Sequence, residues 1–309
     1  MISKRTRGYI SGAVASCSYG LNPLMAMPLF AMGMASYSML FYRYIFAAAI
    51  LGMIMIATRK SLRLQRHQIP PMIIYGLLFS CSSLLLFESY RYIDVGIAST
   101  LLFMYPVIVA LINRIFFKER LSAVTAIAIL LALGGVTLLY FGGGEEGGTL
   151  NLTGVLYVVA SSLSYAIYMV AINRGSIRTL PSSALTFYSI FFGLILYIIL
   201  IAKDGGAYPL NNLTAWTCVI GLALFPTILS ILTMAVAIHD IGSTATAILG
   251  ALEPLTGLAI GIAVFNEQLT PMTIVGIIMI LTAVLLLILA APAIRILRQL
   301  IINRHNSQY

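Results

Sequence analysis

The chain has few charged residues. Aspartate, glutamate, lysine and arginine make up 9% of its 309 residues, and 61% of the residues are hydrophobic, whereas an average soluble domain carries about 25% charged residues. So few charges cannot solvate the surface of a soluble protein of this length. The composition excludes a soluble enzyme, a nucleic-acid-binding domain and a disordered protein. It predicts a chain that lies mostly in a lipid bilayer and has no nucleic-acid partner.

Residues for metal, thiol and nucleotide chemistry are scarce as well. The chain has three cysteines and three histidines, and the cysteines lie singly in apolar runs without a CxxC spacing. Neither a GxxxxGK[ST] motif nor a GxGxxG motif after a strand occurs. We therefore expect no metal and no cofactor. Any transport would draw on an ion gradient or on the substrate's own gradient.

Long apolar runs are what the sequence has in quantity. A helix needs about 20 apolar residues to cross a bilayer, and the stretches that meet this length are 8–30, 34–57, 70–91, 95–117, 121–141, 152–173, 181–202, 213–239, 242–265 and 270–291. The connections are short, and two of them, near 91–95 and 239–242, are almost absent. The sequence predicts an all-α integral membrane protein with ten transmembrane helices.

Basic residues predict the orientation of these spans. If the N-terminus is cytoplasmic, the inner segments hold 15 of the 18 lysines and arginines, and the outer segments hold only Arg91 and Lys203. The acidic residues Glu145 and Glu146 then lie in an outer loop, and Arg43 lies inside a span. We expect a multi-pass protein of the plasma (inner) membrane with both termini cytoplasmic.

The second half of the chain repeats the first half. At an offset of 146 residues, later 148, the matching residues are Gly8 and Gly154, Ser18-Tyr19 and Ser164-Tyr165, Phe41-Tyr42 and Phe187-Tyr188, Asp94 and Asp240, Pro106 and Pro254, and Glu119 and Glu267. Each half holds five spans, and because five is odd the second half enters the membrane the opposite way round. Tandem halves of inverted topology are typical of secondary transporters.

The repeat sets the expected domain organisation. The first five-helix repeat covers residues 1–141, an outer loop 142–151 links the halves, the second repeat covers 152–293, and a cytoplasmic tail covers 294–309. The tail alternates isoleucine or leucine with arginine, so we expect it to lie on the inner membrane surface as a helix.

Several segments carry a family resemblance. They are Ala98–Pro106, Lys118–Leu121 and Gly134–Val136 in the first half, with Ala251–Leu255 and Glu267–Leu269 in the second. The chain resembles the drug/metabolite transporter superfamily, specifically EamA-type transporters with ten spans, over about residues 8–291. The resemblance implies export of amino acids, metabolites or drugs, or movement of sugars or nucleotide sugars. It also implies a central cavity lined by the first four spans of each half, with spans five and ten peripheral.

The two halves differ at one place that matters for the cavity. Span 1 reads Tyr19-Gly20-Leu21-Asn22-Pro23, whereas the equivalent part of span 6 reads Tyr165-Ala166-Ile167-Tyr168. Each half should therefore contribute different groups to the cavity. We expect Asn22, Tyr42, Tyr105, Tyr165 and Tyr168 to be among the substrate-binding residues, although packing with a satisfied hydroxyl is an equal explanation for any one tyrosine.

Ionisable residues inside the spans are the strongest functional pointers, because each costs at least about 2.5–3.5 kcal/mol to insert. Arg43 lies roughly 13 Å deep in span 2; it either binds an anionic substrate group or pairs with a nearby acid. Glu253 lies near the midplane of span 9, where it either carries a proton, binds substrate or packs structurally. Glu88 either faces Arg43 from an outer vestibule or pairs with Arg91 three residues later.

Prolines mark the places where the spans can bend. Pro23 follows Asn22 in span 1, and Pro106 and Pro254 lie at equivalent positions of spans 4 and 9. A proline removes one backbone hydrogen bond and frees a carbonyl, so these residues are predicted hinges around a binding site, with simple kinks as the alternative.

Residues near the span ends have simpler explanations. We expect His239 and Asp240 to cap a helix at the inner junction of spans 8 and 9, and Glu119 and Glu267 to be structural caps in the two halves. Interface anchors are expected at the outer span ends, at Tyr37, Tyr90, Tyr92, Tyr208 and Trp216.

These features favour a secondary active transporter, an exporter of small amphipathic metabolites such as amino acids, that works by alternating access around a midplane cavity. Its partners would be a small-molecule substrate, the lipid bilayer and, if Glu253 carries protons, a proton gradient. A membrane-embedded enzyme is the first alternative, but the sequence contains neither an HExxH motif nor a Ser-His-Asp set at one depth. We therefore expect that the protein is not an enzyme. A passive channel is the second alternative, but the sequence shows no ring of like charges that would select ions.

Overall fold

The computed structural model describes residues 3–59, 63–118, 122–142, 149–175, 177 and 180–306, with side chains up to Leu289 except those of Arg174, Ser243 and Thr244. These residues form helices joined by short turns, and no strand occurs among them. The outer loop with Glu145 and Glu146, the residue Glu119, and the side chains of the C-terminal tail lie outside the described part. The α-helical fold class that the composition predicts is confirmed.

The elements of the two halves follow the same order. The first half consists of α1 (Lys4–Gly20), α2 (Asn22–Ala31), α3 (Ser36–Ala57), the short η1 (Arg66–Gln68), α4 (Ile69–Ser89), α5 (Val95–Leu102), α6 (Tyr105–Phe117) and α7 (Ala123–Gly142). The second half consists of α8 (Leu152–Arg174), α9 (Ser182–Lys203), α10 (Leu213–Ala223), the π-helical η3 (Leu224–Leu229), α11 (Ser230–Leu249), α12 (Leu252–Phe265) and α13 (Pro271–Asn306).

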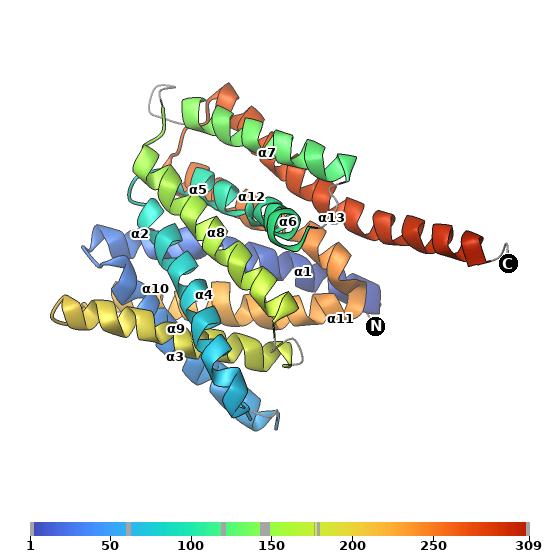
Figure 1. The fold of residues 1–309 in the computed structure, drawn as a ribbon. Helices are drawn as coiled ribbons and strands as arrows, with labels where there is room; N and C mark the ends of the chain where they lie inside the picture. Colours follow the sequence, from blue (N-terminus) through green and yellow to red (C-terminus); the bar gives the residue numbers. More distant parts are fainter. Residues whose placement is uncertain are drawn as a thin grey trace.

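Ten spans agree with this element order. Within the described ranges, nine helical segments are long and apolar enough to cross a membrane. The remaining predicted span, 8–30, is divided at Leu21 into α1 and α2, so neither part reaches the full length alone. Both chain ends lie at the same end of the bundle (Figure 1), as an even number of spans requires.

The boundary between spans 8 and 9 is a kink rather than a loop. The element α11 consists of two helical segments that meet at Gly242, whose backbone has the non-helical angles φ 81° and ψ 165°. Glycine tolerates this conformation because it has no Cβ. The sequence gives almost no linker at this point, and the structure accordingly turns the chain at one residue.

Helices α7 and α13 pack against each other at one edge of the molecule, away from α3 and α9 (Figure 1). Gly135 and Gly276 bring their backbones close: a Cβ at Gly135 would lie 2.8 Å from the Gly276 carbonyl oxygen. Small residues allow such close packing in a bilayer, where no hydrophobic force drives helices together. Spans five and ten are thus peripheral, as the resemblance implies.

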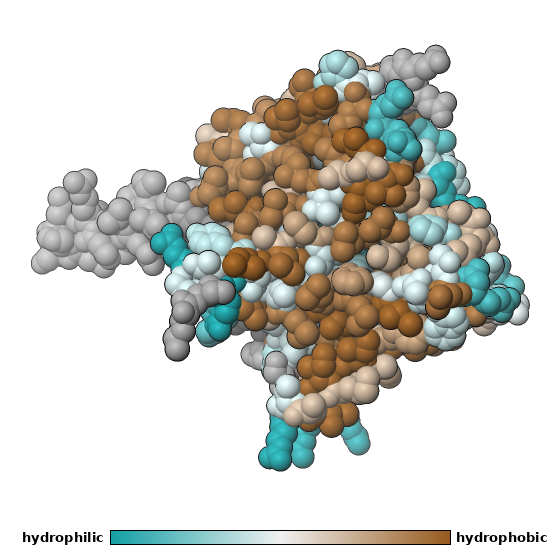
Figure 2. All heavy atoms as spheres, turned by 180° about the vertical axis from the view of Figure 1, so that it is seen from behind, coloured by the Kyte–Doolittle hydropathy of each residue, from teal (hydrophilic) through white to brown (hydrophobic). Residues whose placement is uncertain are grey.

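The two halves pack through equivalent helices. The first helix of each half lies against the third span of the other: α1 packs on α11, and α8 packs on α4. Apolar side chains cover most of the face in Figure 2 and hydrophilic residues gather at its rim. Exposed residues such as Met53, Ile56, Phe116 and Leu130 face outward, as a surface in contact with lipid requires.

Candidate functional site

Three spans break near the centre of the molecule. Span 1 breaks at Leu21, span 4 at residues 103–104 and span 9 at residues 250–251. Each break is followed by a proline in the first turn of the next helix, namely Pro23, Pro106 and Pro254. Proline suits this position because the first helical N–H groups have no intrahelical partner. The sequence prediction placed interruptions here, and whether they act as hinges stays a proposal.

The breaks in spans 4 and 9 are equivalent in the two repeats. Tyr105 and Glu253 each occupy the residue before the proline. The two following helices also end alike, in a left-handed residue: Lys118 with φ 54° and Asn266 with φ 56°. The same arrangement of a break, a proline and a following helix therefore carries a tyrosine in the first half and a glutamate in the second half, at equivalent positions of the two repeats.

A small cavity lies beside these breaks. Its lining comes from both halves and consists of Tyr19, Gly20, Asn22, Pro23, Leu86, Tyr90, Ser99, Leu102 and Glu253. Its volume is about 10 Å³, which is space for about one water molecule. A metabolite-sized ligand needs several hundred Å³, so the cavity in this conformation is too small for one.

Arg43 is buried next to this cavity, with 4% of its surface exposed. Its Nη1 donates to Asn22 Oδ1 and its Nε donates to Thr227 Oγ1, both at 2.9 Å. The guanidinium carbon also lies 5.9 Å from the centre of the Phe87 ring. Among the described residues, Arg43 has no acidic partner, so the alternative of a structural ion pair does not describe this arginine.

Neutral oxygens hold the Arg43 guanidinium from two directions. Asn22 belongs to α2 just after the break in span 1, and its Nδ2 donates to the Tyr19 carbonyl at 2.8 Å. Thr227 belongs to the π-helical η3, and its hydroxyl also donates to the Leu222 carbonyl at 3.0 Å. Because these partners carry no charge, the cation keeps its full positive charge for an anionic group.

Glu253 faces the cavity without a partner. Its side chain lines the cavity, and in the described part of the chain its carboxylate makes no hydrogen bond and no ion pair. It lies in the first turn of α12, where the helix dipole favours a negative charge. Tyr19 lies close enough to interact electrostatically with both Glu253 and Arg43.

Three predicted tyrosines form an aromatic group beside Glu253. The rings of Tyr105 and Tyr165 meet edge-on at 4.7 Å, and Tyr165 stacks on Tyr168 at 5.8 Å. Tyr105 and Tyr165 lie near enough to Glu253 to interact with its charge. The Tyr168 hydroxyl hydrogen-bonds Ser189 at 3.1 Å. None of the three rings belongs to the lining of the cavity.

Two predicted site residues lie elsewhere. The Tyr42 hydroxyl donates to the Tyr208 carbonyl at 2.9 Å. The Glu88 carboxylate lies 3.6 Å from the Arg91 guanidinium, in the spacing-three pair that was one of the two alternatives. Neither side chain belongs to the lining of the cavity.

Sequence reasoning missed some residues of the site. Tyr90, expected as an interface anchor, is instead 5% exposed and lines the cavity, because the turn after α4 directs it inward. Thr227 gave no signal of its own, although Pro226 in the middle of a long apolar run indicates an irregular helix there. Ser99 donates within α5 to the Val95 carbonyl at 2.8 Å and also lines the cavity.

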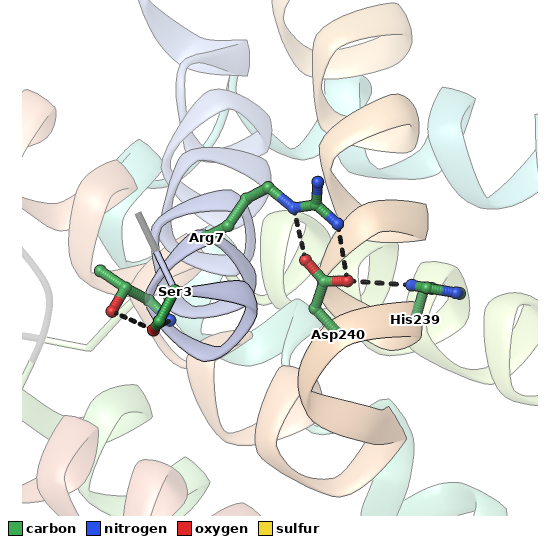
Figure 3. A network of polar contacts seen from close by, with 5 residues as sticks. Ser3, Arg7, His239 and Asp240 are labelled. Carbon is green, nitrogen blue, oxygen red and sulfur yellow. Dashed lines mark hydrogen bonds and ion pairs between the residues drawn. The ribbon is translucent and has the colours of Figure 1, made fainter. Parts of the chain in front are cut away.

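A charged contact joins the halves at the end of the bundle where the chain begins. Arg7 on α1 donates from Nε and a second nitrogen to the two carboxylate oxygens of Asp240 on α11, at 2.7 and 2.9 Å (Figure 3). The Asp240 side chain is inaccessible to solvent, and His239 Nδ1 lies 2.9 Å from it. His239 and Asp240 lie in the last turn before the kink at Gly242, at the predicted junction of spans 8 and 9. Their role as a helix cap stays a prediction.

A second contact joins the halves at the opposite end. Glu267, in the turn after α12, accepts hydrogen bonds from the N–H groups of Val95 and Gly96 at 2.6 and 3.1 Å. These are unpaired donors at the start of α5, so Glu267 caps a helix of the other half. A Cβ at Gly261 would collide with this carboxylate, and a Cβ at Gly96 would lie 3.1 Å from it.

Comparison with known proteins decides the family. The model of the EamA-like transporter family matches the chain twice, at residues 6–141 and 152–289. The chain belongs to the EamA-like transporter family. This EamA-like transporter is 33% identical to the uncharacterized transporter sll1319 of Synechocystis sp. (strain ATCC 27184 / PCC 6803 / Kazusa), over 69% of its own length and 64% of the relative's length.

Other relatives agree with this assignment. The EamA-like transporter is 23% identical to the uncharacterized transporter YdfC of Bacillus subtilis (strain 168), over 73% of its own chain and 74% of the relative. A solved crystal structure shares the fold with a TM-score of 0.65, covering 94% of this chain and 99% of that one at 16% identity. The protein is thus a multi-pass membrane transporter.

The Arg7–Asp240 contact gives a first prediction for the transporter. Arg7→Ala should lower the melting temperature of the purified protein, because the Asp240 carboxylate loses its two hydrogen-bond donors on Arg7. Adding Asp240→Asn should restore much of the loss, since no charge is then left unpaired. Arg5→Ala, on the same helical turn but stacked on Tyr9, is the control. Equal melting temperatures for Arg7→Ala and Arg5→Ala would show that the contact contributes nothing.

Proposed function

We propose that this EamA-like transporter is a secondary active transporter that exports small amphipathic metabolites, amino acids foremost, by alternating access around the midplane cavity. The observation that carries the proposal is one pair of residues. Glu253, which is half-buried, lines the cavity, and the buried Arg43 lies behind the lining residue Asn22. Neither has an ion-pair partner among the described residues. Burying two unpaired charges is costly, and a ligand that carries both opposite charges would offset the cost.

A zwitterionic α-amino acid is such a ligand. Its carboxylate would accept a two-point hydrogen bond from Arg43, whose planar fork matches a carboxylate. Its ammonium group would bind Glu253. Its side chain would lie against the rings of Tyr105, Tyr165 and Tyr168, which join Glu253 at this level of the bundle. The site thus combines charge recognition with an apolar wall, as an amphipathic substrate requires.

Export needs a source of energy, and Glu253 is placed to supply the coupling. A proton and a substrate ammonium group would compete for the same carboxylate, so that one leaves when the other binds. With the cavity open to the outside, a proton neutralises Glu253 and displaces the substrate. Neutral Glu253 then lowers the cost of closing the cavity without substrate. Inward transport of protons would therefore drive outward transport of substrate.

Counterflow in proteoliposomes tests this function. Vesicles loaded with a millimolar unlabelled apolar amino acid, such as leucine, should accumulate the labelled compound transiently, with saturation. Protein-free vesicles should show no accumulation, a passive channel should give equilibration without overshoot, and an enzyme should change the compound chemically. If sugars give the overshoot and amino acids do not, the substrate class is wrong.

The orientation of the transporter in the membrane is tested separately. With the N-terminus cytoplasmic, a cysteine in place of Glu145 in a cysteine-free chain should react with a membrane-impermeant maleimide on intact cells. Arg66→Cys is the matched control and should react only after lysis. The reverse labelling pattern would contradict the orientation that the basic residues predict.

A further inference from the structure

The carbonyl groups at the equivalent breaks in spans 4 and 9 have different hydrogen-bond donors. In the first half, Pro106 lacks an N–H group, so the carbonyl of Leu102, four residues earlier, has no partner within the helix. The Ser162 hydroxyl of α8 lies 3.2 Å from this carbonyl and 3.2 Å from that of Leu101. The break between α5 and α6 is therefore tied to the neighbouring helix of the other half.

The repeat places a matching serine beside the other break. Ser16 in α1 corresponds to Ser162 at the offset of 146 residues. Its neighbours on the same helical face are Gly12 and Gly20, because residues four apart lie one above the other. A Cβ at Gly12 would touch the Leu249 side chain, and one at Gly20 would touch the Glu253 carbonyl. Ser16 therefore faces the break between α11 and α12.

The matching hydrogen bond is absent on this side. The Ser16 side chain is buried, with 2% of the residue exposed, and its hydroxyl oxygen has no hydrogen-bond partner among the described residues. The carbonyl of Gly250, equivalent to that of Leu102, instead accepts a hydrogen bond from the Glu253 N–H at 3.0 Å. The second break is closed by its own backbone and is not tied to α1.

A buried hydroxyl without a partner costs free energy, and such a cost is most simply explained if the group finds its partner in another conformation. We propose that the Ser16 hydroxyl binds the carbonyl of Leu249 or Gly250 in the alternative state of the transporter. Bending during transport is then confined to the second break, next to Glu253. The first break stays fixed by Ser162, and Ser16 is the residue that stabilises the bent form.

This inference rests on the proposal that the protein works by alternating access. Its physical basis is that the Ser162 hydroxyl has a carbonyl partner at the first break, whereas the Ser16 hydroxyl has no partner at the second break. Bending at the second break would release the hydrogen bond between the Glu253 N–H and the Gly250 carbonyl. Ser16 would then replace it. The same movement would shift Glu253 relative to the cavity, so proton or substrate binding at this carboxylate would be linked to the conformation of span 9.

Thermal stability distinguishes the two serines first. Ser162→Ala should lower the melting temperature of the purified transporter, because the Leu102 carbonyl loses its donor, whereas the Leu101 carbonyl still accepts from the Met104 N–H. Ser16→Ala should leave the melting temperature unchanged or raise it, since the hydroxyl has no partner in the conformation described here. A fall for Ser16→Ala as large as that for Ser162→Ala would show that Ser16 already has a partner, and would overturn the inference.

Distance measurements between spin labels then test the movement without any substrate. In a cysteine-free chain, one label pair reports on the second break, with labels at Val264 and Ala31. The repeat-equivalent residue Phe116, paired with Asn173, reports on the first break; all four side chains are exposed. We expect two distances for the Val264–Ala31 pair and one distance for the Phe116–Asn173 pair.

The less populated of the two Val264–Ala31 distances would report the bent form of span 9. Ser16→Ala should reduce the population with this distance about fivefold, which is the effect of losing one ordinary hydrogen bond. Ser162→Ala should leave that pair unchanged and broaden the other. Two distances for both pairs, or a minor population that Ser16→Ala does not alter, would overturn the inference. Because no substrate is present, this failure is distinguishable from a failure of the proposed function, which counterflow alone reports.

Discussion

Arg43→Ala is expected to lower kcat/KM for transport by about 30-fold or more, because truncating one partner of a buried charge pair costs about 2–5 kcal/mol. Most of the effect should appear as weaker apparent affinity, since Arg43 would bind the substrate carboxylate. The variant should still insert and fold, as its present partners, Asn22 and Thr227, are neutral. Initial rates of uptake across a range of substrate concentrations give both parameters.

Two further variants make the Arg43 test specific. Arg43→Lys should rescue transport poorly, because an ammonium group lacks the planar fork that holds Asn22 and Thr227 at once. Arg91→Ala removes an exposed arginine that pairs with Glu88 and should leave kcat/KM near the wild-type value. Wild-type uptake kinetics in Arg43→Ala would show that the arginine has no part in binding substrate.

Glu253→Gln is expected to abolish gradient-driven transport and the dependence of transport on pH, because glutamine cannot exchange a proton. Some exchange of substrate for substrate should remain, since exchange needs no net movement of protons. The apparent affinity of the Glu253→Gln variant for the substrate should be lower, because a neutral amide holds an ammonium group more weakly than a carboxylate does. Uptake driven by an imposed pH gradient, measured beside exchange at equal pH, separates these effects.

The control for Glu253 is Glu88→Gln, which changes an acid that lies outside the cavity lining. It should keep the wild-type pH profile and gradient-driven rate. If Glu253→Gln also keeps the wild-type pH profile, Glu253 carries no proton. If binding measured without a gradient weakens while the pH profile persists, Glu253 serves the substrate ammonium group alone.

The spans, the repeat and the breaks could be predicted from the sequence because each has a local cause. About 20 apolar residues define a span, and a proline preceded by a polar or aromatic residue marked the breaks at Pro23, Pro106 and Pro254. The positions of Arg43 and Glu253 inside their spans followed from counting residues along a helix. Such reasoning needs no knowledge of how the helices are rotated.

The partners of these residues could not be predicted for the opposite reason. Lipid and protein core are both apolar, so the pattern of a membrane helix does not show which face points inward. Thr227, which accepts a hydrogen bond from Arg43, lies within the π-helical η3. Tyr90 has the residue type and the sequence position of an interface anchor, but it lines the cavity. Asp240 and Arg7 are 233 positions apart in the sequence, so their contact has no local signal.

Ligand analogues combined with the two charge variants give the most direct measurement of the central claim, that Arg43 and Glu253 together recognise a zwitterion. Counterflow would be measured for leucine, for leucinamide, which lacks the carboxylate, and for N-acetylleucine, which lacks the ammonium group. The wild-type transporter should prefer leucine over both analogues. Arg43→Ala should lose the preference over leucinamide only, and Glu253→Gln should lose the preference over N-acetylleucine only. Wild-type selectivity in both variants would contradict the account, because the two charges would then play no part in recognition.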